Sequence, residues 1–394
     1  MYSLRRAATA LHPRSVQSRA TTTPRIVTPA LTCGRHVHLE GLALAPVVFG
    51  GLFVALWTWK CCMMVIFQNK IIFMPGLPPN ARGEKVEDYA KQCAGICWRE
   101  ERLRASDGKN LALCMADVEL GQPPKDQKPV SSFYILYFQG NASSIPPRLP
   151  DLSSVLAMLK RQLHDEPQDV RLTFVCLSYR GYWTSKGRPT EKGIRLDAAA
   201  ALNWISRQHE DMADHHIRKS DCSTNQTARV ILWGQSIGSG VATNLAAEHH
   251  MPKNLLLDSL ILETPFTSIR AMLEVLYPQK WLPYKYLWPF LRNHLDSWKN
   301  LGLMSKRYSI DEHRPSIFIL KAAKDELVPT VLSHELHDRA KDLEFSVGMK
   351  AVQGAFHNDT MFRAEGRRFL SEYIARRIQN TRGGDGASLP IPNN

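Results

Sequence analysis

The stretch Ala228–His249 reads ARVILWGQSIGSGVATNLAAEH and joins three kinds of local signal. Its first residues, through Trp233, are apolar apart from one arginine, which predicts a buried strand. The residues from Ile237 onward are mostly small or apolar and contain no proline, which predicts a helix. Between the two lies the turn GQSIG, a G-x-S-x-G pattern centred on Ser236. The sequence therefore predicts a serine on a sharp strand-to-helix turn.

The two glycines around Ser236 give this turn a chemical meaning. A serine on such a turn projects its hydroxyl above the sheet only if the neighbouring backbone packs closely, and glycine has no Cβ to prevent this. The helix that follows directs backbone N–H groups and a partial positive charge at a developing oxyanion. Strand, tight turn and helix are the context of a nucleophile elbow. We therefore predict Ser236 as a nucleophile and the N–H of Ile237 as an oxyanion donor.

A nucleophilic serine needs a base, and the base needs an acid to orient it. In folds with a nucleophile elbow, the chain order is Ser, then Asp or Glu, then His. Asp325 follows the apolar run 317–321, at a strand end, where α/β folds build their sites. His357 lies in the loop GAFHND before the last predicted helix. We predict the triad Ser236, Asp325 and His357, with Glu326 as the alternative acid.

The second oxyanion donor is expected in the loop after the strand predicted at 132–138. This loop reads QGNA, and its glycine allows a backbone N–H to turn toward the oxyanion. We predict the N–H of Asn141 as this donor, with Ala142 as the near alternative.

No metal or organic cofactor is needed for this chemistry, and none is predicted. Cys93 and Cys97 are spaced as C-x3-C without a second pair at zinc spacing, so a metal site is not expected. They would pair as a disulfide only if the domain lies in an oxidising lumen.

The remaining apolar runs alternate with helical patterns, which predicts the α/β class. We expect an α/β-hydrolase fold over 98–379, with a mostly parallel, doubly wound sheet. Strands are predicted at 98–104, 110–119, 132–138, 172–178, 230–233, 256–263 and 317–321, and helices at about 152–164, 192–209, 237–249, 331–341 and 362–378.

One stretch, 265–314, interrupts the alternation and is rich in Trp, Tyr, Pro and Leu. We interpret it as a helical cap inserted over the sheet. Two roles are open: an acyl-chain pocket or membrane-contacting surface, or an ordinary packed helical excursion.

The N-terminal part of the chain predicts a membrane anchor. Residues Gly41–Trp59 carry no charge and are long enough to cross the hydrocarbon core as a helix. We expect one transmembrane helix over 41–67, a linker over 68–97 and a disordered tail over 380–394.

The leader, 1–40, has six Arg and nine Ser or Thr before its first acidic residue. Its composition fits a mitochondrial presequence and fits a short basic cytoplasmic tail equally well. A single-pass protein of the endoplasmic reticulum or another endomembrane is favoured, with a mitochondrial membrane as the alternative. The chain has a formal net charge of +13, but none of its basic stretches is interleaved with a nucleic-acid recognition motif. Nucleic acid is therefore not expected as a partner.

Several short motifs carry a resemblance to a known family. They are QGNA at 139–142, YRGY at 179–182, GRPTE at 187–191, GQSIGSG at 234–240, ETPFTS at 263–268, DELVP at 325–329 and GAFHND at 354–359. On these motifs the chain resembles the bud-emergence-type branch of the membrane-anchored α/β-hydrolase-domain-containing serine hydrolases. The resemblance implies hydrolysis of an ester, thioester or amide through an acyl-enzyme. It also implies a lipid-like or acylated substrate and contact with a membrane.

The chain departs from this family at three positions. Gln139 stands where the family has His, Trp183 where it has Gly, and Ser178 where it has Asp or Asn. The change at Gln139 leaves open a non-catalytic membrane scaffold. Within the enzyme class, a serine peptidase is a separate alternative. Of the N-x-S/T sequons, only Asn225 lies in a loop suited to a glycan, and only if the domain is lumenal.

Overall fold

The structure is a computed structural model that describes residues 39–121, 131–165, 170–217, 227–308 and 313–380. The chain separates into two units, Met1–Leu56 and Trp57–Asn394. The predicted leader up to residue 38, the predicted tail from residue 381 and Asn225 lie outside the described residues.

Helix α1 spans Leu39–Phe73 and includes the predicted anchor. Its segment Leu44–Phe73 is long and apolar enough to cross a membrane, by length and composition. The helix extends beyond the predicted end at residue 67, into the predicted linker. It does so because Gln68 and Asn69, which are polar, find hydrogen-bond partners in the segment around Asn293.

The second unit is built on a sheet whose described strands follow the order β1-β2-β4-β3-β5-β6-β7-β8. Strand β2 runs antiparallel to β1 and β4, and all other neighbouring pairs are parallel. The strands are β1 Arg99–Arg104, β2 Asn110–Leu120, β3 Ser131–Phe138, β4 Val170–Ser178, β5 Ala228–Gln235, β6 Leu255–Glu263, β7 Ser316–Ala322 and β8 Val347–Val352.

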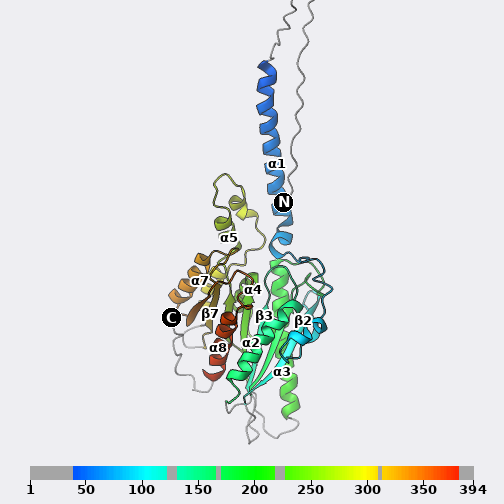
Figure 1. Cartoon of the computed structure of the whole chain (residues 1–394), viewed down its shortest axis with the longest axis vertical. Coiled ribbons are helices and arrows are strands. Elements are labelled where there is room, and N and C mark those ends of the chain that lie inside the picture. The colour runs from blue at the N-terminus through cyan, green and yellow to red at the C-terminus, as the bar shows by residue number, and fades with distance from the viewer. Residues whose placement is uncertain (1–38, 122–130, 166–169, 218–226, 309–312, 381–394) are drawn as a thin grey trace, which may run out of the picture. The chain divides into compact units, whose positions relative to one another are not determined.

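Helices cover both faces of this sheet, and the predicted α/β-hydrolase architecture is confirmed. Helices α2 and α8 pack against each other on one face (Figure 1), and α3, α4, α6 and α7 cover the other. The helices of this unit are α2 Leu149–Gln162, α3 Glu191–Ile217, α4 Ile237–Glu248, α5 Ile269–Leu276, α6 Ser297–Arg307, α7 Thr330–Asp342 and α8 Ala364–Asn380, with short 3-10 helices η1 Val86–Gln92, η2 Pro146–Arg148 and η3 Tyr284–Phe290.

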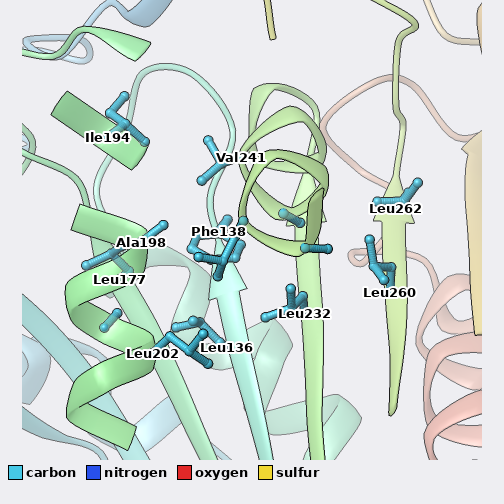
Figure 2. Close-up of a cluster of buried hydrophobic side chains, with 14 of the residues drawn as sticks. Leu136, Phe138, Leu177, Ile194, Ala198, Leu202, Leu232, Val241, Leu260 and Leu262 are labelled. Carbon is cyan, nitrogen blue, oxygen red and sulfur yellow. The ribbon is translucent and has the colours of Figure 1, made fainter. Parts of the chain in front are cut away.

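The core lies on both faces of the central strands because their side chains alternate in direction. In β3, Leu136 and Phe138 point to the face covered by α3 and α4, while Tyr137 belongs to the opposite cluster. Figure 2 shows Leu136 beside Leu202 of α3. Strands buried on both faces consist of nearly continuous apolar residues, which is why the sequence predicts β3 and β5 well.

Strand β8 was not predicted from the sequence. It reads VGMKAV and lies at the sheet edge, where its residues are mostly half-buried. An edge strand needs no continuous apolar run, so it gives a weak sequence signal.

The predicted cap insertion also differs from the structure at its C-terminal end. In α6, Leu301 and Met304 are buried and belong to the core cluster shared with α4. Helix α6 is therefore part of the layer that covers the sheet. Helix α5 and η3 form the remaining excursion, where Trp281, Tyr286 and Phe290 are exposed.

Candidate active site

Ser236 lies on the turn between β5 and α4, as the G-x-S-x-G pattern predicts. Its backbone has φ 52° and ψ −116°, a strained conformation for a residue other than glycine. Two hydrogen bonds hold the turn: the Ser236 N–H donates to the Glu263 carbonyl at 2.8 Å, and the Ser239 hydroxyl donates to the Gly234 carbonyl at 2.8 Å. This strain orients the Ser236 side chain away from the strand, at the carboxyl end of the sheet.

Close backbone packing explains both glycines of the pattern. A Cβ on Gly234 would lie 2.2 Å from the carbonyl oxygen of Gly238, and a Cβ on Gly238 would lie 2.1 Å from that of Phe138. Neither distance is compatible with a side chain. The start of α4 thus lies directly against the end of β3 and the loop that follows it.

His357 brings the three predicted triad residues together. Its Nε2 lies 2.9 Å from Ser236 Oγ, and its Nδ1 lies 2.8 Å from Asp325 Oδ2. A carboxylate only accepts hydrogen bonds, so Nδ1 carries the proton and Nε2 is free to accept the serine hydroxyl. The side chains of His357 and Asp325 are 2% and 4% exposed, so water screens this interaction weakly.

The two candidate acids, Asp325 and Glu326, have different partners. Asp325 Oδ1 accepts hydrogen bonds from the backbone N–H groups of Leu327, at 3.0 Å, and Val328, at 2.7 Å, which fix the carboxylate facing His357. Glu326 instead accepts the backbone N–H of His357 at 3.0 Å. The geometry thus favours Asp325 as the imidazole partner, and Glu326 holds the loop that carries His357.

The loop Gln139–Ser143, called the oxyanion loop below, follows β3. Within the described residues, the Asn141 N–H has no hydrogen-bond acceptor, whereas the Ala142 N–H donates to the Phe73 carbonyl at 3.1 Å. Of the two predicted donors, only Asn141 therefore has its N–H available for a substrate. The other predicted donor, Ile237, is the first residue of α4. The N–H groups of the first turn of a helix have no partner inside the helix.

Gln139, which stands where the resembling family has His, is 2% exposed. Its side-chain amide has no hydrogen-bond partner among the described residues. Its backbone carbonyl accepts the Tyr179 hydroxyl at 2.8 Å, which ties the oxyanion loop to the end of β4.

A buried carboxylic acid below the site was not assigned a role from the sequence, although it opens the motif ETPFTS. Glu263 accepts hydrogen bonds from Trp233 Nε1 at 3.2 Å and from the Thr360 hydroxyl. Complete burial raises the pKa of Glu263, which these hydrogen bonds oppose only in part. Through its hydrogen bond from Thr360, Glu263 links the end of β6 to the loop that carries His357.

The described residues contain no group of three or more His, Cys, Asp and Glu side chains placed to hold a metal ion. Cys93 and Cys97 are both free thiols in this structure. Cys93 is buried and its thiol donates to the Tyr89 carbonyl, so packing accounts for it.

No protein-family model matches the chain. It is 28% identical over 320 residues to the α/β-hydrolase-domain-containing protein WAV2 of Arabidopsis thaliana, covering 79% of this chain and 87% of that protein. It is 29% identical over 321 residues to the uncharacterized membrane protein YNL320W of Saccharomyces cerevisiae, covering 79% and 90%.

A third relative is the lysophosphatidylserine lipase ABHD12 of Bos taurus, 32% identical over 193 residues. That alignment covers 48% of this chain and only 43% of the lipase. Among solved structures, the Pyrococcus furiosus esterase Pf2001 aligns with 74% of this chain and 92% of its own, with a TM-score of 0.46 and 16% identity. On its sequence relatives and its own sheet topology, the chain is similar to membrane-associated α/β-hydrolase-domain proteins and is a serine-hydrolase-type enzyme.

Proposed function

We propose that this protein hydrolyses an ester or thioester bond of a lipid or acylated substrate through an acyl-enzyme on Ser236. The observation that carries the proposal is the connected pair of contacts at His357, 2.9 Å to Ser236 Oγ and 2.8 Å to Asp325 Oδ2. The first contact lies within the range in which a base can take a proton from a nucleophile, and the second within the range in which an acid orients that base.

In the acylation step, Ser236 Oγ attacks the acyl carbonyl carbon while His357 Nε2 takes the hydroxyl proton. The Asp325 carboxylate stabilises the imidazolium that forms. The negative charge that develops on the carbonyl oxygen is held by the N–H groups of Ile237 and Asn141. The tetrahedral intermediate collapses when His357 returns the proton to the leaving oxygen or sulfur.

In the deacylation step, a water molecule takes the place of the leaving group. His357 removes its proton, the resulting hydroxide attacks the acyl carbon, and the same N–H groups stabilise the oxyanion. Collapse releases the carboxylic acid and returns the proton to Ser236 Oγ.

Two observations support a lipid substrate. The relative from Bos taurus is named a lysophosphatidylserine lipase. The chain also carries an apolar helix suited to a membrane, and side chains of the cap such as Trp281 and Phe290 are 73% and 60% exposed. Exposed apolar side chains of this size suit contact with lipid.

The location that we propose is an endomembrane, and foremost the endoplasmic reticulum.

Fluorophosphonate labelling of the purified full-length protein tests the proposal. The probe reacts with activated serines, so we expect labelling of the wild type and of Ser305→Ala, and none of Ser236→Ala. Ser305 is a suitable control because its hydroxyl only bonds the Gly302 carbonyl within α6. A folded wild type that is not labelled would instead indicate a non-catalytic scaffold.

Activity on a panel of acyl esters, thioesters and peptide amides would then separate a lipid or thioester hydrolase from a peptidase. Turnover of the amides alone would contradict the proposed substrate class.

A further inference from the structure

The C-terminal end of α1 lies against the oxyanion loop. The last carbonyls of a helix have no partner inside the helix and are available to other groups. The carbonyl of Phe73, the final residue of α1, accepts hydrogen bonds from the Ala142 N–H at 3.1 Å and from the Tyr182 hydroxyl. Just beyond the helix, the Leu77 carbonyl accepts the Ser143 N–H at 2.5 Å.

The loop residues held by these bonds have strained backbones. Ala142 has φ 59° and Ser143 has φ 61°, in the left-handed region that side chains disfavour. Such conformations persist only where the surroundings hold them. The peptide N–H of Asn141 lies directly before this pair, so its direction depends on the same contacts.

The end of α1 is itself fixed by polar contacts to the segment before α6. Gln68, only 5% exposed, donates from Nε2 to the Phe290 carbonyl at 3.1 Å and accepts the Arg292 N–H at 2.7 Å. Asn69 Oδ1 accepts a hydrogen bond from Asn293 Nδ2 at 2.6 Å. These side chains hold the last turns of α1 at one position and one rotation.

The chain after α1 continues along the same loops. Trp183 Nε1 donates to the Glu84 carbonyl at 2.7 Å, and the Ser144 hydroxyl donates to the Glu84 carboxylate. Arg82 donates to the Gly181 carbonyl at 2.5 Å. The segment that follows α1 thus contacts both loops at the carboxyl end of the central strands, after β3 and after β4.

We propose that the last turns of α1 and the segment to Leu77 position the oxyanion loop, so that the anchor helix completes the active site in addition to holding it at a membrane. The inference rests on the proposed function, because it concerns the oxyanion donor of that reaction. Tyr182 and Asn69 act as positioning residues: Tyr182 through the Phe73 carbonyl, and Asn69 through the placement of α1.

The test measures kcat and KM of the full-length protein in detergent micelles with p-nitrophenyl acetate, a soluble ester. It also measures inhibition by an alkylboronic acid, which forms a tetrahedral adduct on the nucleophile. Loss of one oxyanion donor lowers kcat roughly 10²–10³-fold, so a displaced donor should have a smaller effect. For Tyr182→Phe and Asn69→Leu we expect kcat to fall about 10-fold, the boronate inhibition constant to rise in parallel, and KM to stay within about two-fold.

Two further variants separate positioning from general destabilisation. Asn69→Asp keeps the oxygen that accepts from Asn293 and should restore kcat to near the wild-type value. Tyr308→Phe removes a hydroxyl that bonds the Ala246 carbonyl near the far end of α4, and should leave kcat and the boronate constant unchanged.

Unchanged kcat in Tyr182→Phe and Asn69→Leu would overturn the inference, as would losses that follow only the fraction of folded protein. Those results leave the proposed function intact, because the wild type is active. A wild type that neither turns over esters nor reacts with fluorophosphonate refutes the proposed function, and this inference with it.

Discussion

At the scale of single residues, the site depends on backbone conformations that the surrounding packing enforces. Ser236 has a positive φ, and the glycines on either side of it leave no space for a Cβ. Such strain is stable only when neighbouring elements hold it, here through the Glu263 carbonyl and the end of β3. The conformation of Ser236, the proposed nucleophile, is therefore sensitive to small changes in the residues that hold this turn.

Gly238→Ala should unfold the protein or lower its free energy of unfolding by more than about 4 kcal/mol. The new Cβ would lie 2.1 Å from the Phe138 carbonyl oxygen. In an exposed helix the same change stabilises by about 1 kcal/mol, so the clash reverses the usual sign. Gly302→Ala in α6 is the matched control, since its Cβ would meet only the flexible end of Arg339. Thermal unfolding of both variants checks the prediction, and equal stability would contradict it.

Asp325→Asn should lower kcat by about 10³–10⁴-fold with little effect on folding. An amide in place of the carboxylate no longer ensures that Nδ1 of His357 carries the proton, so Nε2 is less available as a base. Glu326→Gln keeps an oxygen for the His357 backbone N–H and should cost far less activity. Initial rates with a soluble ester measure kcat of both variants. A larger loss of kcat in Glu326→Gln than in Asp325→Asn would reverse the assignment of the two acids.

At the scale of elements, the helices differ in how they serve the site. In the proposed mechanism, α4 directs its N-terminus at the oxyanion and α1 supports the oxyanion loop, whereas α6 covers the sheet. Helix α2 lies on the face of the sheet opposite to α4 and α6, where it packs against α8. It carries Asp151 in its first turn. Burial raises the pKa of Asp151 to about 6, although Arg148 and Arg367 oppose the shift.

Asp151→Asn tests this shift through the pH dependence of stability. Between the unfolded value of 3.8 and about 6, the folded state binds more protons at Asp151 than the unfolded state does. Its contribution to wild-type stability therefore falls as pH rises through that window. We expect the variant to match the wild type near pH 4 and to exceed its stability above pH 7. Urea unfolding across this pH range measures the difference in free energy of unfolding between the variant and the wild type. A difference that stays constant with pH would exclude the raised pKa of Asp151.

At the scale of the whole molecule, the described chain combines an apolar helix with a compact hydrolase unit. Many side chains of the α1 segment within the first unit, such as Phe49 and Phe53, are more than half exposed. A long exposed apolar surface of this kind is stable in a lipid environment and a liability in water. Membrane association thus follows from the helix itself.

Val48→Lys combined with Leu52→Lys should release the protein from membranes into the alkaline carbonate supernatant or cause it to aggregate. Each lysine costs roughly 3 kcal/mol at the centre of a transmembrane helix. Glu87→Lys with Glu335→Lys adds two lysines at exposed positions outside α1 and should leave the protein in the membrane pellet. Retention of the α1 variant in that pellet would indicate a different mode of attachment.

The sequence by itself determined the features that depend on local order. Strand, G-x-S-x-G turn and helix occur within one continuous stretch, so the position of Ser236 on a strand-to-helix turn could be predicted from neighbouring residues. The order of Asp325 and His357 along the chain was also readable, with Asp325 after a predicted strand and His357 in the loop before the last predicted helix. The α/β class followed from apolar runs alternating with helical patterns, and it is confirmed.

Only the tertiary structure decided how distant segments meet. The edge strand β8 leaves only a weak local pattern, and the place of α6 in the sheet cover and the contact between Phe73 and Ala142 leave none. The choice between Asn141 and Ala142 as donor was open in the sequence for the same reason. It depends on a carbonyl at the end of α1, far away along the chain, which only packing brings beside the oxyanion loop.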